Sequence, residues 1–379
     1  MDEKESKQAY AYTPGLKVKK FEKITKERRL PVSGETLVKK GERVDYDKIV
    51  AEAFIPGDPS VIKVAIHLQV EADEINNYMV KKVGDHVDEG EPLAQYRGFF
   101  GLVKKDINSP VSGEVESISE ATGQVIVRGE PIPVNVDAYV PGEVVEIHEG
   151  TGVVIQTNAA LIQGIFGVGG EAHGRLKIIS KRPDEMLTAD MLSPEDKGRI
   201  LVGGSVVTLD ALRKAVEIGA AGIVAGGVGH LDLREFMGRD LGVAITGQEK
   251  LGIILIITEG FGKMAMSDMT YNLLSEFDGK MTHINGTTQI RAGVLRPEII
   301  IAHDETYEES SEKFSEGMVP GTPIRIIREP YFGAIGKVVS LPVDLVKLES
   351  ESYVRVLNAE LNDGSIVTIP RANVEIIEE

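Results

Sequence analysis

Four segments of the chain combine small residues with polar side chains that could bind a ligand or catalyse a reaction. Each follows a stretch that reads as a strand: Gly203-Gly204-Ser205, Gly226-Gly227-Val228-Gly229-His230, Thr258-Glu259-Gly260-Phe261-Gly262 and Asn285-Gly286-Thr287-Thr288. Small residues at a strand exit let backbone N–H groups approach a bound group, and the N-terminus of a following helix favours an anion. The pattern predicts a small anionic ligand, such as a nucleotide or phosphate, with His230, Asp232 and Glu259 as polar contacts or acid–base groups.

A second interpretation is that these connections contain Gly only because short loops need it to turn. No Gly-x-x-x-x-Gly-Lys-Ser/Thr loop occurs, and the seven His are scattered without metal-ligand spacing. There is no Cys, which excludes disulfides and thiolate chemistry. We expect neither a metal nor a cofactor, and the sequence leaves open whether the protein is an enzyme.

The elements around these segments alternate between strand and helix from residue 184 to residue 301. The pattern predicts strands at 199–205, 221–229, 250–262 and 280–290, and helices at 208–219, 230–238 and 267–279. Thr208 is a plausible N-cap, and Gly219 lies just past the helix end. This alternation predicts an α/β domain with a short parallel sheet, in which all strand exits share one edge.

A Gly-rich stretch at 161–179, "LIQGIFGVGGEAHGRLKII", looks at first like a dinucleotide-binding loop. That motif needs a helix after the glycines, but Gly174 is followed by "RLKII", which reads as a strand. We predict a Gly-rich hairpin with His173 in its turn.

The N-terminal half contains internal repeats. Pro-Val-Ser-Gly-Glu occurs at 31–35 and at 110–114, with a looser echo from Val140, and "KKGERV" at 39–44 is repeated as "KKVGDHV" at 81–87. Two strand–turn–strand units that cannot bury their faces alone are expected to pack on each other.

The phrases "KKVGDHVDEGEPLAQ" and "SPVSGEVESI" resemble the barrel-sandwich hybrid of biotinyl and lipoyl carrier domains. Carrier families place the modified Lys at a hairpin tip, a position that Leu102 occupies here, and Lys104 and Lys105 are out of register. The resemblance therefore implies a non-carrier module without covalent biotin or lipoate. Phe99 and Phe100, near the expected tip, are candidate partner contacts, with core packing as the alternative.

The C-terminal segment resembles the KOW motif of SH3-like barrels. The resemblance lies in "PIRIIREPYFGAIGKVV" and "YVRVLNAELNDGSIVTIPRANVEII", and it implies contact with RNA or protein. Tyr331 and Phe332 are candidate partner contacts. From Ile324 onward, however, six basic residues face nine acidic ones, which disfavours phosphate binding.

Composition gives further limits. The chain has 379 residues and a net charge of −17, which disfavours a broad nucleic-acid surface. Between Lys17 and Arg43, ten basic residues face four acidic ones, which indicates a solvated arm or a contact with an anionic partner. The longest apolar run, at 253–257, is too short to enter a membrane as a span, so we expect a cytoplasmic protein.

Together these patterns predict an α+β multidomain protein. Its parts are a 1–29 N-terminal arm, a 30–183 barrel-sandwich hybrid (lipoyl-like) β domain, a 184–301 α/β domain, a 302–319 acidic linker or helix, and a 320–379 KOW SH3-like barrel. The expected function is that of a non-enzymatic scaffold or adaptor with protein partners, and homo-oligomerisation is left open. The alternatives are an α/β protein that binds an anionic ligand or catalyses a reaction, and an RNA-, ribosome- or transcription-associated factor.

Overall fold

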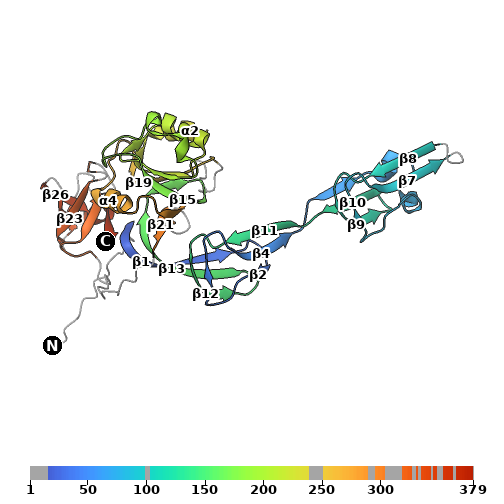
Figure 1. Ribbon diagram of the computed structural model, residues 1–379, viewed down its shortest axis with the longest axis horizontal. Coiled ribbons are helices and arrows are strands. Elements are labelled where there is room, and N and C mark those ends of the chain that lie inside the picture. The colour runs from blue at the N-terminus through green and yellow to red at the C-terminus, as the bar shows by residue number, and fades with distance from the viewer. Residues whose placement is uncertain are drawn as a thin grey trace. The chain divides into compact units, whose positions relative to one another are not determined.

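The computed structural model describes residues 16–98, 103–238, 251–288, 295–303, 318–326, 330–331, 334–342, 345–347, 353–361 and 364–378 (Figure 1). Contacts divide the chain into two compact units, one of residues 1–25, 139–142 and 156–379 and the other of residues 26–138 and 143–155. Strands in several sheets dominate both units, so the chain is strand-rich and multidomain.

The second unit contains two copies of one β module. The first copy consists of β2 (Glu35–Thr36), β3 (Arg43–Val44), β4 (Ile49–Ile55), β11 (Ile132–Asp137) and β12 (Gly142–His148). The second copy consists of β5 (Pro59–Ile62), β6 (His86–Val87), β7 (Pro92–Gly98), β8 (Val103–Asn108), β9 (Gly113–Ser119) and β10 (Gln124–Gly129). Corresponding strands have equal lengths: seven residues in β4 and β7, six in β11 and β8, and seven in β12 and β9.

Backbone hydrogen bonds confirm that the two copies are equivalent. In the first copy, backbone N–H groups donate to carbonyls from Leu37 to Val50 (2.9 Å), from Gly41 to Val144 (2.7 Å) and from Ala138 to Lys48 (2.9 Å). The corresponding bonds of the second copy run, in the same order, from Val80 to Leu93 (2.8 Å), from Gly84 to Val115 (2.9 Å) and from Ser109 to Glu91 (2.9 Å). The counterpart of the Pro110–Glu114 segment is therefore the looser echo after Val140. The identical pentapeptide at 31–35 leads into β2 instead and is not its structural equivalent.

The prediction that the two repeats pack on each other is wrong. The second copy is inserted between β4 and β11, and its sheet, β5-β10-β9-β6, is separate from the β11-β4-β2 sheet. The inserted copy carries its own cover, α1 (Val64–Leu68) and the 3₁₀ helix η1 (Ala72–Asn77), whose apolar residues join the cluster around Leu93 and Val115. Because this cover buries the apolar face, the copy does not need the other repeat as a partner.

The basic N-terminal segment is a strand rather than a solvated arm. β1 (Leu16–Arg29) buries Leu16, Val18 and Ile24 and pairs in parallel with β27 (Val374–Glu378). Its cations have partners within the chain: Lys17 and Lys19 contact Glu22, Lys20 contacts Glu276, and Arg28 contacts Asp137. Burial of alternate apolar residues therefore incorporates the segment into the fold.

The first unit contains the expected parallel sheet. Its parallel strands are β15 (Glu171–Ile178), β16 (Ile200–Val202), β17 (Val206–Val207), β18 (Gly222–Val228) and β19 (Ile254–Phe261). The helices are α2 (Leu209–Ile218), α3 (His230–Met237) and α4 (Asp268–Glu276). Thr208 caps α2, since its hydroxyl accepts the Ala211 N–H at 3.2 Å, and Gly219 ends the helix with φ +74°.

Antiparallel strands close this sheet into a ring. β19 pairs with β14 (Phe166–Val168), β15 with β20 (Met281–Asn285), β20 with β21 (Glu298–Ala302), and β21 with β13 (Gly152–Gln163). Hydrogen bonds from Gly164 to Pro297 and from Ile165 to Ile257 continue β13 into β14 and complete the ring. Residues 156–178 therefore belong with the α/β strands, and the β module ends earlier than the predicted residue 183.

Two sequence predictions fail in this ring. β20 is antiparallel to β15, and Asn285 pairs with Glu171 at the start of β15, so the 285–288 segment lies at the opposite edge from the other three exits. His173 lies within β15, opposite His283, and not in a turn. The stretch 161–179 contains strands and no helix, as expected, but it does not form the predicted hairpin, because β14 pairs with β19 and β15 pairs with β16 and β20.

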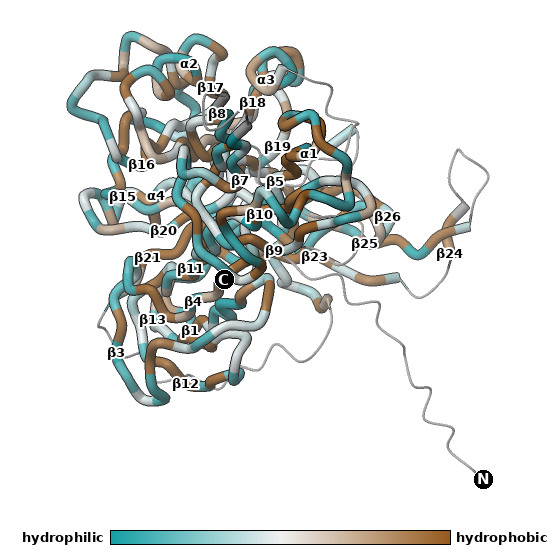
Figure 2. Tube along the Cα trace, turned by 90° about the vertical axis from the view of Figure 1, so that its right-hand side faces the viewer, coloured by the Kyte–Doolittle hydropathy of each residue, from teal (hydrophilic) through white to brown (hydrophobic). Residues whose placement is uncertain are grey.

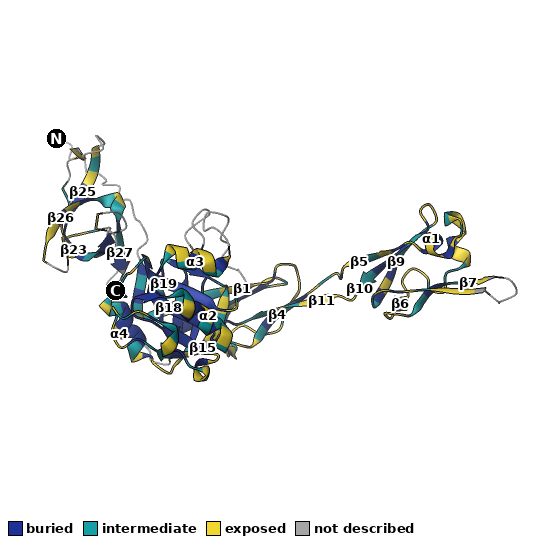
Figure 3. Ribbon diagram, turned by 90° about the horizontal axis from the view of Figure 1, so that it is seen from above, coloured by how far each residue is buried: buried dark blue, intermediate teal, exposed yellow. Residues whose placement is uncertain are grey.

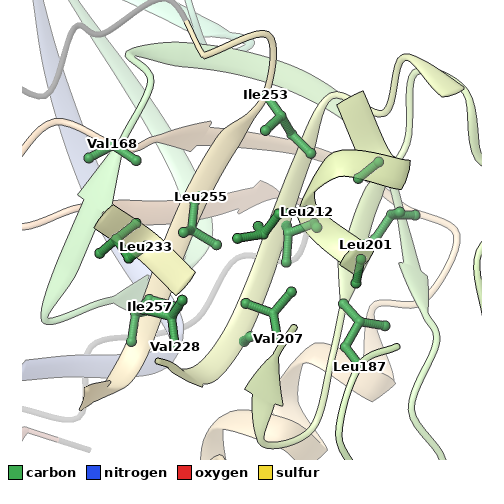
Figure 4. Packing of buried hydrophobic residues seen from close by; sticks show 14 of the residues in the cluster. Val168, Leu187, Leu201, Val207, Leu212, Val228, Leu233, Ile253, Leu255 and Ile257 are labelled. Atoms are coloured by element: carbon green, nitrogen blue, oxygen red, sulfur yellow. The ribbon is translucent and has the colours of Figure 1, made fainter. Parts of the chain in front are cut away.

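The parallel strands are buried on both faces, as is usual for such sheets (Figure 3). Leu201, Ile223 and Leu255 point to the side covered by α2 and α3, where Leu212 and Leu233 complete the cluster (Figure 4). The alternate residues of the same strands, Ile200, Val224 and Ile256 among them, pack with Leu274 of α4 and with β20 and β21.

The C-terminal part is antiparallel. It contains β22 (Pro323–Ile326), β23 (Ile335–Ser340), β24 (Leu345–Lys347), β25 (Tyr353–Leu361), β26 (Ile366–Pro370), the 3₁₀ turn η4 (Arg371–Asn373) and β27. Ile324, Val338, Leu357 and Ile369 are in its core. Gly364 has φ +82°, and the Leu361 N–H donates to the Ser365 carbonyl, which closes the β25–β26 turn.

A buried carboxylate gives the α/β part a testable pH dependence. Asp196 is fully buried, accepts the Ser193 N–H at 2.9 Å and contacts the Lys177 ammonium. Burial alone raises the pKa of Asp196, but the hydrogen bonds from Lys177 and Ser193 outweigh it and bring the pKa below 3.8. This contribution to stability is therefore complete above the unfolded-state pKa and disappears as pH falls through the lower folded-state pKa.

We expect Asp196→Asn to lower the free energy of unfolding at neutral pH by about 1.5 kcal/mol, since hydrogen bonds to a charged group are lost. The loss should shrink as the pH approaches the folded-state pKa. Urea denaturation of both proteins across the acidic range measures this difference, and parallel pH profiles would contradict the assignment.

Candidate functional site

The three remaining predicted segments do meet at the carboxyl edge of the parallel sheet. Gly226, Gly227 and Gly260 lie inside β18 and β19, while Gly203, Gly204 and Ser205 connect β16 to β17. Gly229 precedes α3, and His230 and Asp232 lie in the first turn of that helix. Gly262 follows β19.

Four backbone N–H groups at this edge donate to carbonyls of the chain itself. The donors and their carbonyl acceptors are Gly203 to Val224 (2.8 Å), Ser205 to Glu185 (2.8 Å), Gly227 to Ser205 (3.1 Å) and Gly262 to Val228 (2.9 Å). A phosphate-binding loop instead directs several N–H groups at the ligand. Among the described residues, these amides do not form such a loop.

Close backbone packing explains the glycines. A Cβ on Gly204 would lie 2.1 Å from the Arg182 carbonyl oxygen, and a Cβ on Gly227 would lie 2.3 Å from that of Gly262. A Cβ on Gly226 would lie 2.6 Å from the Met264 carbonyl oxygen. These contacts support the second interpretation, in which Gly is needed for local geometry.

The three polar residues do not form one catalytic group. His230 is exposed, and Asp232 is half-buried beside Gly229. Glu259 is buried and accepts the Ser267 N–H, at the start of α4, at 3.1 Å. The described contacts of Glu259 thus lead to α4 and to an arginine of β22, away from α3.

That arginine, Arg325, forms a buried ion pair with Glu259. Its Nη1 lies 3.5 Å from Glu259 Oε2 and donates to the carbonyls of Thr258 (3.0 Å) and Glu259 (3.3 Å). Both side chains are buried, so the pair fixes the C-terminal strands against the sheet edge. In the sequence, Arg325 stood out only as one of the basic residues after Ile324. The available signal was its place between Ile324 and Ile326, which by strand alternation turns Arg325 away from the apolar core of the C-terminal strands.

A different feature stands out on the surface: a two-stranded ribbon formed by β24 and the start of β25 (Figure 2). Leu345 and Tyr353 are 56% and 65% exposed, and Val346 pairs with Val354 on the other face. At the root of the ribbon, Arg371 donates to the carbonyls of Val356 (3.1 Å) and Pro342 (2.9 Å). We call residues 345–347 and 353–355 the C-terminal ribbon.

The C-terminal ribbon exposes apolar side chains on both faces, with Leu345 and Tyr353 on one face and Val346 on the other. Of the predicted partner contacts, Tyr331 is 40% exposed. Phe99, Phe100 and Phe332 lie outside the described residues.

No group of three or more His, Asp and Glu side chains in the described part of the chain is arranged to hold a metal ion. None of the described helices combines the length and apolarity needed to cross a bilayer. No protein-family model matches the chain, and no curated protein matches it at a significant level.

Proposed function

We propose that the protein is a non-enzymatic adaptor that holds a protein partner on its β modules, with the C-terminal ribbon as the main contact. The exposure of apolar side chains on both faces of this ribbon carries the proposal. The sheet edge supports it, because the amides of Gly203, Ser205, Gly227 and Gly262 there already donate to backbone carbonyls.

The chemistry of the ribbon suits a protein. Tyrosine and arginine are enriched at the centre of protein interfaces, and the ribbon contains Tyr353 and Arg355 beside the exposed apolar side chains of Leu345 and Val346. Full burial of a side chain such as Leu345 is worth about 1.5–3 kcal/mol relative to exposure, so a few of them suffice for a specific contact. Arg371 supports this role, since it holds both strands at the root and limits the ordering cost on binding.

The module types are part of the proposal. Each copy in the second unit pairs short strands that are joined by Gly turns, as expected of a barrel-sandwich hybrid. The second copy is inserted in the sequence between β4 and β11 of the first. The C-terminal strands end with a 3₁₀ turn before the last strand, as expected of an SH3-like barrel. We assign both types on these features together with the sequence resemblance.

Placing positive charges on the apolar positions of the ribbon should strongly reduce partner recovery. We expect the wild-type protein to co-purify from its native host with a protein partner in stoichiometric amount. Leu345→Lys combined with Tyr353→Lys should lower the recovered amount of this partner at least tenfold. Stability should change by less than about 0.5 kcal/mol, because both side chains are exposed. The measurement is quantitative mass spectrometry of the purified complexes.

The matched control is Val32→Lys combined with Leu37→Lys, two exposed apolar residues of the second unit. The control should recover the partner as the wild type does. Recovery of the wild-type protein as a lone monomer, or unchanged recovery with the ribbon variant, would contradict the proposal. Recovery of RNA in place of a protein would favour the RNA-associated alternative.

A further inference from the structure

Three cations lie near the end of the β7–β8 hairpin of the second copy. Arg97 pairs with Lys104 on one face of the hairpin, and Lys105 pairs with Tyr96 on the other face. Lys104 and Lys105 are exposed, and the Arg97 side chain is 44% exposed. The described acid nearby is Asp106, whose Oδ1 lies 3.9 Å from Arg97 Nη2.

The duplication provides an internal comparison for these three cations. In the β4–β11 hairpin of the first copy, Phe54 pairs with Pro133, and Ala53 pairs with Val134. These pairs occupy the same register positions as Arg97 with Lys104 and Tyr96 with Lys105. Because the first copy folds the same hairpin without any of the three cations, the module does not need them for its structure.

The three cations contrast with the overall balance of the chain, which has 59 acidic and 42 basic residues. Charged groups on a surface mainly steer and orient partners of opposite sign. The three cations therefore point to an anionic partner, which is a protein segment, a nucleic acid or a membrane.

The number of charges favours a protein. Proteins that hold nucleic acid tightly make roughly 6–10 phosphate contacts, and three cations on a chain of net charge −17 supply far fewer. Recognition of anionic lipid typically uses clusters of about 4–8 Lys or Arg. A short acidic segment, by contrast, needs only a few opposing charges at the rim of a contact.

We propose that the end of the β7–β8 hairpin, through Arg97, Lys104 and Lys105, binds an acidic segment of a partner protein. This surface belongs to a different unit from the C-terminal ribbon, and the inference does not depend on the ribbon.

The test uses a fluorescein-labelled Glu-rich peptide, with a single-stranded RNA and phosphatidylserine vesicles as competing classes of anion. Full-length wild type is compared with the hairpin variant Arg97→Glu, Lys104→Glu and Lys105→Glu. We expect the peptide to bind the wild type with a salt-dependent affinity that falls at least tenfold in the hairpin variant. RNA and vesicles should bind weakly and equally to both proteins.

The control variant, Lys39→Glu, Lys40→Glu and Lys82→Glu, makes the same change in net charge at exposed positions of the same unit. It should alter peptide affinity less than twofold. A neutral variant, Arg97→Gln with Lys104→Gln and Lys105→Gln, should lose an intermediate part of the peptide affinity. This variant keeps the test decisive if the hairpin variant fails to fold. Absence of peptide binding by the wild type, equal losses in hairpin and control variants, or hairpin-dependent binding of RNA or vesicles above that of the peptide would overturn the proposal.

Discussion

Arg325→Met lowers the free energy of unfolding of the first unit by about 3–5 kcal/mol, because it leaves the Glu259 carboxylate buried without its counter-charge. The substitution keeps most of the apolar stem of the side chain but removes its two hydrogen bonds and its ion pair at the sheet edge. The loss should appear in thermal and denaturant unfolding.

Two further variants distinguish the stability contribution of this ion pair from that of side-chain packing in general. Adding Glu259→Gln to Arg325→Met should recover part of the loss, since the uncompensated charge is then gone. Arg355→Met, at an exposed arginine of the ribbon, should change stability by less than about 0.5 kcal/mol. Equal stability of Arg325→Met and Arg355→Met would show that the buried pair does not hold the C-terminal strands in place.

Gly227→Ala is expected to cost about 3 kcal/mol, since the added Cβ would meet the Gly262 carbonyl oxygen at 2.3 Å inside a fully buried strand. The added Cβ clashes with a backbone atom, and no change of rotamer can move either atom. Denaturant unfolding of the protein without added ligands measures it.

Gly262 provides the matched control at the same edge. It has φ +97°, but nothing lies within 4 Å of the position of its Cβ. Gly262→Ala should therefore cost only about 1–2 kcal/mol, the usual penalty for a side chain in left-handed conformation. If Gly227→Ala leaves stability unchanged but removes the binding of a nucleotide or phosphate, the glycines serve a ligand after all.

The local elements were accessible from the sequence because their signals are short-range. Thr208 caps the start of α2 and Gly219 ends it, as predicted, and the Ser267 side chain caps the start of α4 in the same way as Thr208. The direction of β20 was not accessible, because strand and helix alternation gives the order of elements but not the partner that an added strand selects.

The repeats show a similar limit. The two copies were visible in "KKGERV" and "KKVGDHV", yet the identical pentapeptide suggested the wrong alignment. The hydrogen-bond pattern ties Val115 to Val144, which the weaker echo marks. Insertion of one copy into a hairpin of the other is a long-range event that leaves no periodic signal. Likewise, the pairing of Arg325 with Glu259 depends on docking between elements far apart in sequence.

Hydrogen exchange of the full-length protein with and without its co-purified partner tests the central claim most directly. We expect slower exchange in residues 345–347 and 353–355 on binding, with unchanged exchange at 203–205 and 259–262. Protection confined to the sheet edge at 203–205 and 259–262, with no change in the ribbon, would contradict it.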